Sequence, residues 1–124
     1  MSFDRRLWVL ALLLACSDAI SEEYVCTYQW EGKSNNHLFR FEVSGPFAKQ
    51  KGSSLNLTYD ILENSATEMM LSETHTKKRS GKDYPVGITV VVLDKASGKL
   101  IRSNTYADRS FNNFAYGECL QVTQ

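Results

Sequence analysis

One segment, residues 86–102, constrains the fold of this chain more than any other. Residues 88–93 read Ile-Thr-Val-Val-Val-Leu, a run of β-branched and bulky side chains that suits a pleated strand and crowds a helix. Because the run is short and unbroken rather than alternating, it predicts a strand that is covered on both faces. A chain reversal should follow, since Asp94 can accept from N–H groups two residues on and Gly98 can adopt a positive φ.

This hairpin requires a larger sheet, because two strands alone are marginally stable in water. Residues 100–106 are predicted to return as its second strand. Alternation of apolar and polar residues predicts further strands at 22–31, 38–43, 54–62 and 114–122. Residues 66–74 fit either a strand or a short helix opened by Ser65 and Glu68. The strand is favoured because a meander through neighbouring strands is the simplest path.

These segments predict an all-β fold of about seven strands, an antiparallel meander forming a small sandwich or barrel. The aromatic face of the first strand should point inward, with Tyr24, Tyr28 and Trp30 beside Cys26. Residues 47–54 are predicted to be a polar connection, residues 63–65 a turn and residues 75–85 a long polar loop.

The first 21 residues are predicted to be a secretory signal peptide that precedes a single β-domain at 22–124. Arg5 and Arg6 come before the apolar run 7–15, which is shorter than the roughly 20 residues of a membrane-spanning helix. Two kinds of processing fit. Cleavage before Glu22 would release a periplasmic or secreted domain, and it is favoured because residues 16–21 have the length of an ordinary c-region. Alternatively, residues 13–16 resemble a bacterial lipobox, in which Cys16 would be lipidated and anchor the protein to the envelope.

Export would place the two cysteines of the β-domain, Cys26 and Cys119, in an oxidising compartment. In an oxidising compartment an even pair predicts an intramolecular disulfide. Such a bond would close most of the domain into one loop and stabilise it by about 4–5 kcal/mol in the chain-entropy description. A free buried thiol or an intermolecular bridge is the alternative.

The charge balance and the absence of known motifs reduce the number of functional classes that fit this sequence. The chain has 14 basic and 14 acidic residues, so it has no overall field for nucleic acid, and membrane contact is expected only through a lipid on Cys16. The two histidines, His37 and His75, lack the spacing of metal ligands and are expected to be solvated. Neither a nucleophile elbow nor a phosphate-binding glycine loop is present. The sequence therefore predicts a non-catalytic binding or accessory module without metal or cofactor, for an unidentified protein or small ligand.

The most polar segment carries Lys77, Lys78, Arg79 and Lys82. Such a basic cluster is typical of a solvated loop that improves solubility. It also fits a charged loop that is offered to an acidic partner.

Two resemblances bear on this choice. Residues 80–84 (Ser-Gly-Lys-Asp-Tyr), with 23–26 and 119–121, resemble bacterial C-type lysozyme inhibitors, which are small exported or lipidated β-barrels. That resemblance implies that Ser80 and Tyr84 enter a lysozyme cleft with help from a lysine, and we include Lys82 among the expected partner contacts. Residues 94–98 stand where those inhibitors carry Lys-Gly-Asp-Glu-Ala. More broadly, the patterns at 24–26, 93–98 and 116–119 are similar to small uncharacterised proteobacterial secreted β-proteins, which implies a location and a fold.

Overall fold

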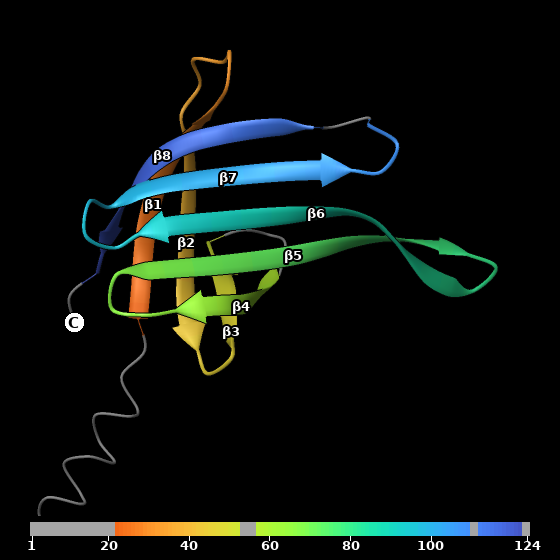
Figure 1. The fold of residues 1–124 in the computed structure, drawn as a ribbon, viewed down its shortest axis with the longest axis horizontal. Coiled ribbons are helices and arrows are strands. Elements are labelled where there is room, and N and C mark those ends of the chain that lie inside the picture. The colour runs from red at the N-terminus through yellow and green to blue at the C-terminus, as the bar shows by residue number, and fades with distance from the viewer. Residues whose placement is uncertain (1–21, 53–56, 110–111, 123–124) are drawn as a thin grey trace, which may run out of the picture.

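The computed structural model describes residues 22–52, 57–109 and 112–122. The predicted signal peptide, its cleavage and the lipidation of Cys16 lie outside these residues. Eight antiparallel strands form one closed barrel in chain order, so β8 pairs with β1 (Figure 1). The strands are β1 Glu22–Trp30, β2 His37–Ser44, β3 Phe47–Lys51, β4 Thr58–Asn64, β5 Glu68–Arg79, β6 Lys82–Asp94, β7 Lys99–Tyr106 and β8 Asn113–Gln121. The all-β, antiparallel prediction is confirmed, and of its two forms the structure has the barrel.

The prediction of a polar connection at 47–54 is wrong, because residues 47–51 form β3. It pairs Ala48 with Val43 of β2 and with Tyr59 of β4. Its inward side carries only a small residue, Ala48, which is fully buried, and a polar one, Gln50. Without large apolar side chains the period of two is not visible in the sequence.

The strand favoured for residues 66–74 is confirmed, because β5 begins at Glu68. Ser65 caps the turn before it rather than a helix, since its Oγ accepts a hydrogen bond from the Glu68 N–H at 3.1 Å. The turn predicted at 63–65 lies slightly later, because β4 continues to Asn64.

The predicted hairpin is formed by β6 and β7. Asp94 Oδ1 accepts from the Ala96 N–H at 3.0 Å, and Gly98 has a φ of 76°. The prediction that residues 88–93 are covered on both faces is wrong. Val91 and Leu93 point into the barrel and are 1% exposed, whereas Ile88 points outward and is 40% exposed.

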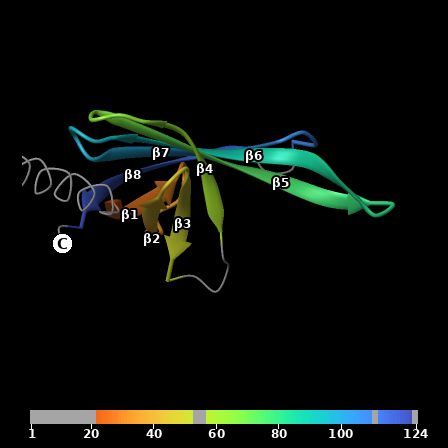
Figure 2. The same ribbon diagram turned by 90° about the horizontal axis from the view of Figure 1, so that it is seen from below.

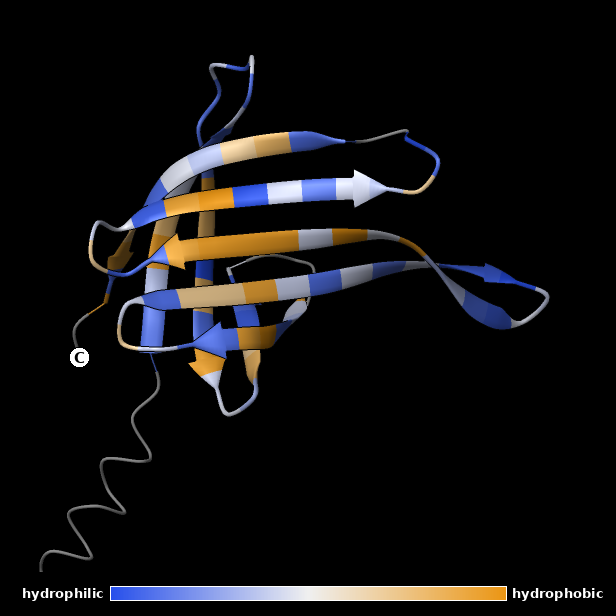
Figure 3. Ribbon diagram, viewed as in Figure 1, coloured by the Kyte–Doolittle hydropathy of each residue, from blue (hydrophilic) through white to orange (hydrophobic). Residues whose placement is uncertain are grey.

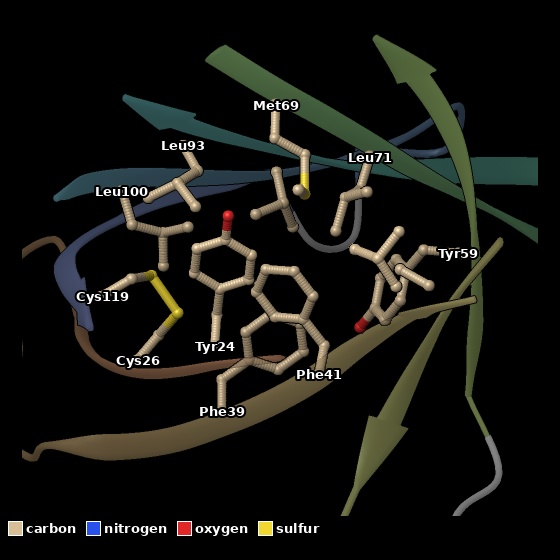
Figure 4. Close-up of a cluster of buried hydrophobic side chains, with 13 residues drawn as sticks. Tyr24, Cys26, Phe39, Phe41, Tyr59, Met69, Leu71, Leu93, Leu100 and Cys119 are labelled. Atoms are coloured by element: carbon tan, nitrogen blue, oxygen red, sulfur yellow. A yellow bond between two sulfur atoms is a disulfide. The ribbon is translucent and has the colours of Figure 1, made fainter. Parts of the chain in front are cut away.

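Inward-facing side chains fill one end of the barrel with apolar groups (Figure 4). Phe41 is central, with its ring centroid 5.2 Å from those of both Tyr24 and Phe39. Aliphatic residues of β5, β6 and β7 pack on these rings: Met69, Leu71, Val91, Leu93 and Leu100. The aromatic face predicted for the first strand points inward as expected, with Tyr24 buried and Cys26 fully buried.

The seam between β1 and β8 closes the barrel, and the predicted disulfide lies in it. Cys26 and Cys119 are directly opposite in the ladder and are bonded to each other. Two positions away, a Cβ on Gly117 would lie 2.0 Å from the carbonyl oxygen of Thr27. Only glycine allows the two strands to approach so closely, so the seam depends on this residue as well as on the sulfur bridge.

Candidate functional site

The β5–β6 hairpin is longer than the barrel that it helps to build. The last pair between β6 and β7 is Gly87 with Tyr106, whereas β5 and β6 continue to pair as far as Arg79 with Lys82. We call residues 76–85, in which β5 and β6 pair only with each other, the arm. It projects away from the barrel in both views (Figures 1 and 2).

The prediction of a long loop at 75–85 is therefore wrong. The arm is a two-stranded ribbon closed by a two-residue turn, in which Ser80 has a φ of 52° and Gly81 a φ of 78°. Two consecutive positive φ values are typical of a tight hairpin turn whose twist matches the strands. Because both sides of the ribbon are polar, the sequence shows no apolar alternation there (Figure 3).

The pleat of the arm divides its basic residues between two sides. Lys77 lies opposite Tyr84, and Arg79 lies opposite Lys82, so these four side chains share one side. We call them the cationic face. On the other side Lys78 lies opposite Asp83, a pair of opposite charges. The fold thus places three of the four cations together with one aromatic ring.

A β-bulge sets the direction of the cationic face. Pairing of His75 with Gly87 is followed by pairing of Thr76 with Pro85, which leaves Val86 as the extra residue. The Val86 carbonyl oxygen instead accepts from the Ala107 N–H at 2.9 Å. A depression of about 290 Å³ runs along this side, lined by Lys77, Arg79, Tyr84, Pro85, Val86, Ala107 and Asp108.

Of the predicted partner contacts, Lys82 and Tyr84 lie together on the cationic face, and Ser80 forms the tip. The Tyr84 side chain is 45% exposed. An exposed ring beside cations can contact a partner through its apolar surface and its hydroxyl group. The Arg79 guanidinium presents a planar donor fork that matches a carboxylate. Together these groups are suited to bind an anionic surface.

The interior of the barrel becomes polar toward the base of the arm. His75 Nε2 lies 2.7 Å from Thr89 Oγ1, which in turn donates to Asn104 Oδ1 at 2.5 Å. Since the Thr89 hydroxyl proton is directed to Asn104, His75 Nε2 must be the donor of the first bond. The His75 ring also stacks on Tyr106, with centroids 5.2 Å apart. The expectation that His75 is a solvated surface residue is therefore wrong, whereas His37 is exposed and stacks on Tyr28.

Arg102 is a second interior polar residue that the sequence reasoning missed. Its guanidinium carbon lies 5.5 Å from the Tyr28 ring centroid and 5.4 Å from that of Phe39. Burial raises the pKa of Tyr59, and the charge of Arg102 partly offsets that effect. The sequence does contain a pattern that predicts this position, because alternation from Leu100 places Arg102 on the inward side of its strand.

At the opposite end of the barrel from the arm, a small cluster holds the start of β1. The Tyr24 hydroxyl donates to Glu22 Oε2 at 2.6 Å, and Lys95 Nζ donates to the same oxygen at 3.3 Å and to Asn64 Oδ1 at 2.6 Å. Burial raises the pKa of Glu22, but these hydrogen bonds and the Lys95 charge outweigh it, so the net pKa is lowered. Burial and the Glu22 carboxylate raise the pKa of Tyr24. This cluster anchors the barrel and lies far from the arm.

Within the described residues, no group of three or more His, Cys, Asp or Glu side chains is placed to hold a metal ion. No helix in the described part of the chain is long and apolar enough to cross a membrane. Both cysteines of the barrel are in the disulfide, so neither provides a free thiolate nucleophile.

A scan against models of protein families, a search of curated proteins and a search of solved structures found no match to this chain. The geometry and chemistry of the arm and the barrel are therefore the basis for a functional conclusion.

Proposed function

We propose that this protein is an exported, non-catalytic binding module that engages an acidic protein partner through the cationic face of its arm. The observation that carries the proposal is the placement of Lys77, Arg79, Lys82 and Tyr84 on one side of a projecting ribbon. Export to the periplasm or the medium is supported by the Cys26–Cys119 disulfide, which is compatible with an oxidising compartment.

The physics of the arm favours an anionic partner. The segment 76–85 contains four cations and one carboxylate, Asp83, on a chain with no net charge overall. Asp108 is an acidic residue that lines the depression beside the arm. Because the chain as a whole is neutral, the attraction of the arm for an anionic partner is local rather than a field of the whole protein. A charge patch of this kind raises the rate of encounter with an oppositely charged surface, and Arg79 and Tyr84 are residue types that often dominate binding energy.

The test is capture of partners from envelope extract, followed by affinity measurement with each purified partner. We expect the double variant Arg79→Ala/Lys82→Ala to lose at least about tenfold in affinity, since each charged hydrogen bond to a partner contributes roughly 1.5–3 kcal/mol. Lys78→Ala is the matched control, because Lys78 is a cation of the same arm on the other side. Equal affinity of the double variant and the wild type would reject the proposal.

A second candidate is an inhibitor of a secreted hydrolase, and the shape of the arm favours it. A narrow convex ribbon that ends in Ser80 and Gly81 is suited to enter a concave active site. Glycosidase clefts contain a pair of catalytic carboxylates, which the cationic face could oppose. This candidate agrees with the resemblance of residues 80–84 to bacterial C-type lysozyme inhibitors.

The inhibitor candidate predicts that the wild type, in molar excess, suppresses turnover by a C-type lysozyme. Tyr84→Ala should weaken the inhibition and Lys78→Ala should retain it. Full lysozyme activity in the presence of excess wild-type protein would exclude this candidate while leaving the more general binding proposal open to its own test.

A further inference from the structure

The two edges of the arm differ in their backbone. β4 pairs with β5 only as far as Ser72, and β7 pairs with β6 only as far as Gly87, so among the described residues neither edge of the arm has a partner strand. The β6 edge is interrupted by Pro85, which has no N–H to donate, and by the extra residue Val86. β5 carries no proline, glycine or bulge from Glu68 to Arg79. Proline and bulges are devices that keep other strands away from an edge, so only the β6 edge is closed in this way.

The hydrogen-bonding pattern of the ladder shows which backbone groups lie on the β5 edge. The two-residue turn makes Arg79 and Lys82 a hydrogen-bonded pair, and in an antiparallel ladder such pairs alternate with pairs that are not bonded. Thr76 and Lys78 are therefore in pairs that are not bonded, and their N–H and C=O groups point away from β6. The start of β5 follows the same alternation, because the Glu68 carbonyl oxygen accepts from an N–H of the turn after β4 at 2.8 Å.

The side chains beside this edge are cationic at three successive positions, Lys77, Lys78 and Arg79. Because successive side chains point to opposite sides of a strand, Lys77 and Arg79 lie on the cationic face and Lys78 lies on the other side. Lysines on an edge deter pairing with a copy of the same strand, since like charges directly opposite each other are destabilising. Acidic residues in those positions would instead stabilise the pair.

We infer that an extended acidic segment of a protein partner adds to the β5 edge of the arm as a third strand. Strand addition, which rests on the proposed function, gives the partner a conformation as well as a charge. The backbone of the segment bonds to Thr76 and Lys78, and its acidic side chains lie opposite the three cations of β5. This mode of recognition takes its affinity from the main chain and its specificity from the side chains. Tyr84, on β6, stays free to contact the rest of the partner.

Calorimetric titration of the purified product of the full chain with a capped acidic peptide tests the inference. The peptide carries successive glutamates between valine and threonine residues, and a version with glutamines in their place is the uncharged control. Thr76→Pro removes an N–H from the β5 edge and should weaken binding of the acidic peptide at least about tenfold. The ladder to β6 is retained in this variant, because the Thr76 N–H points away from β6. Thr76→Val keeps the N–H and is the matched control, which should bind as the wild type does.

Amide hydrogen exchange gives a second measurement that needs no substitution. In the free protein the amides of Thr76 and Lys78 should exchange faster than those of Lys77 and Arg79, which bond to β6. The acidic peptide should slow exchange at Thr76 and Lys78 in particular. An alternation that the bound peptide leaves unchanged would overturn strand addition, because attraction between side chains alone does not protect the edge amides.

The variants separate strand addition from the proposed function. Loss of affinity in Arg79→Ala/Lys82→Ala but not in Thr76→Pro would overturn strand addition and leave the proposed function standing. Equal affinity of both variants and the wild type would overturn both. Absence of binding by the wild type, or equal binding of the acidic and the glutamine peptides, would overturn the inference of an acidic strand.

Discussion

The barrel body and the arm are built from the same two strands, yet they are held together by different forces. In the body, Met69 and Leu71 of β5 are buried in a core to which all eight strands contribute side chains. In the arm, Lys77 and Arg79 of the same strand are exposed, and the ladder to β6 is the only regular pairing. Strand pairing alone is marginal in water, so the body carries the stability of the molecule and the arm is available for contact.

The largest loss of stability is expected from a substitution at the centre of the core of the body. Phe41 is fully buried between two other rings, so Phe41→Ala should lower the free energy of unfolding by about 3–5 kcal/mol. Urea denaturation followed by tryptophan fluorescence measures this change. A loss below about 1 kcal/mol would mean that the ring cluster does not hold the body together.

The disulfide gives the second-largest effect. Cys26→Ala/Cys119→Ala should destabilise the barrel by about 2–5 kcal/mol, because the bond restricts a long loop of the unfolded chain. Hydrogen exchange should accelerate in β1 and β8, whereas amides of the arm, already fast, should change little. Faster exchange confined to the arm would contradict the assignment of stability to the seam.

A smaller effect depends on pH and on the Glu22 cluster. Because the pKa of Glu22 is lowered in the folded state from its ordinary value of 4.5, its ionised form stabilises the fold above that pH. This contribution is lost as the pH falls through the folded-state pKa. Glu22→Gln should therefore be less stable than the wild type at neutral pH, and the difference should shrink in acid. Thermal unfolding from pH 7 to pH 2 measures it, and a constant difference would contradict the predicted linkage.

The smallest effect is expected in the arm, with a substitution similar in size to that at Phe41. Tyr84→Ala removes a ring that is 45% exposed, so the free energy of unfolding should change by no more than about 0.5 kcal/mol. Urea denaturation of this variant beside Phe41→Ala gives the contrast directly. A loss comparable to that of the core variant would show that the arm is part of the folded body.

Sequence patterns predicted those parts of the molecule in which one side of a strand is apolar. The alternation in residues 22–31 identified β1 and its inward side, and the composition of 86–106 identified the β6–β7 hairpin. Two parts of the fold were not predicted, the strand β3 and the arm. β3 has only Ala48 and Gln50 on its inward side, and the arm is polar on both sides.

The candidate site was only partly predictable. Lys82 and Tyr84 were identified by type and motif, but their common side with Arg79 depends on the register of the ladder. His75 and Arg102 were missed because a polar residue is expected to be solvated, and only the tertiary structure places these two on the inward side of the barrel. The apolar run at 88–93 was expected to be covered on both sides, and the structure leaves one side open.

By itself the sequence determined that this chain forms antiparallel strands and that Cys26 and Cys119 can pair, because strand propensity, turn residues and cysteine number are local properties. Only the tertiary structure decided that the strands close into a barrel, that β5 and β6 extend beyond it, and that the β5 edge of the arm has no partner strand among the described residues. These features depend on which residues of different strands lie opposite each other, and that register is fixed by the packing of the whole barrel.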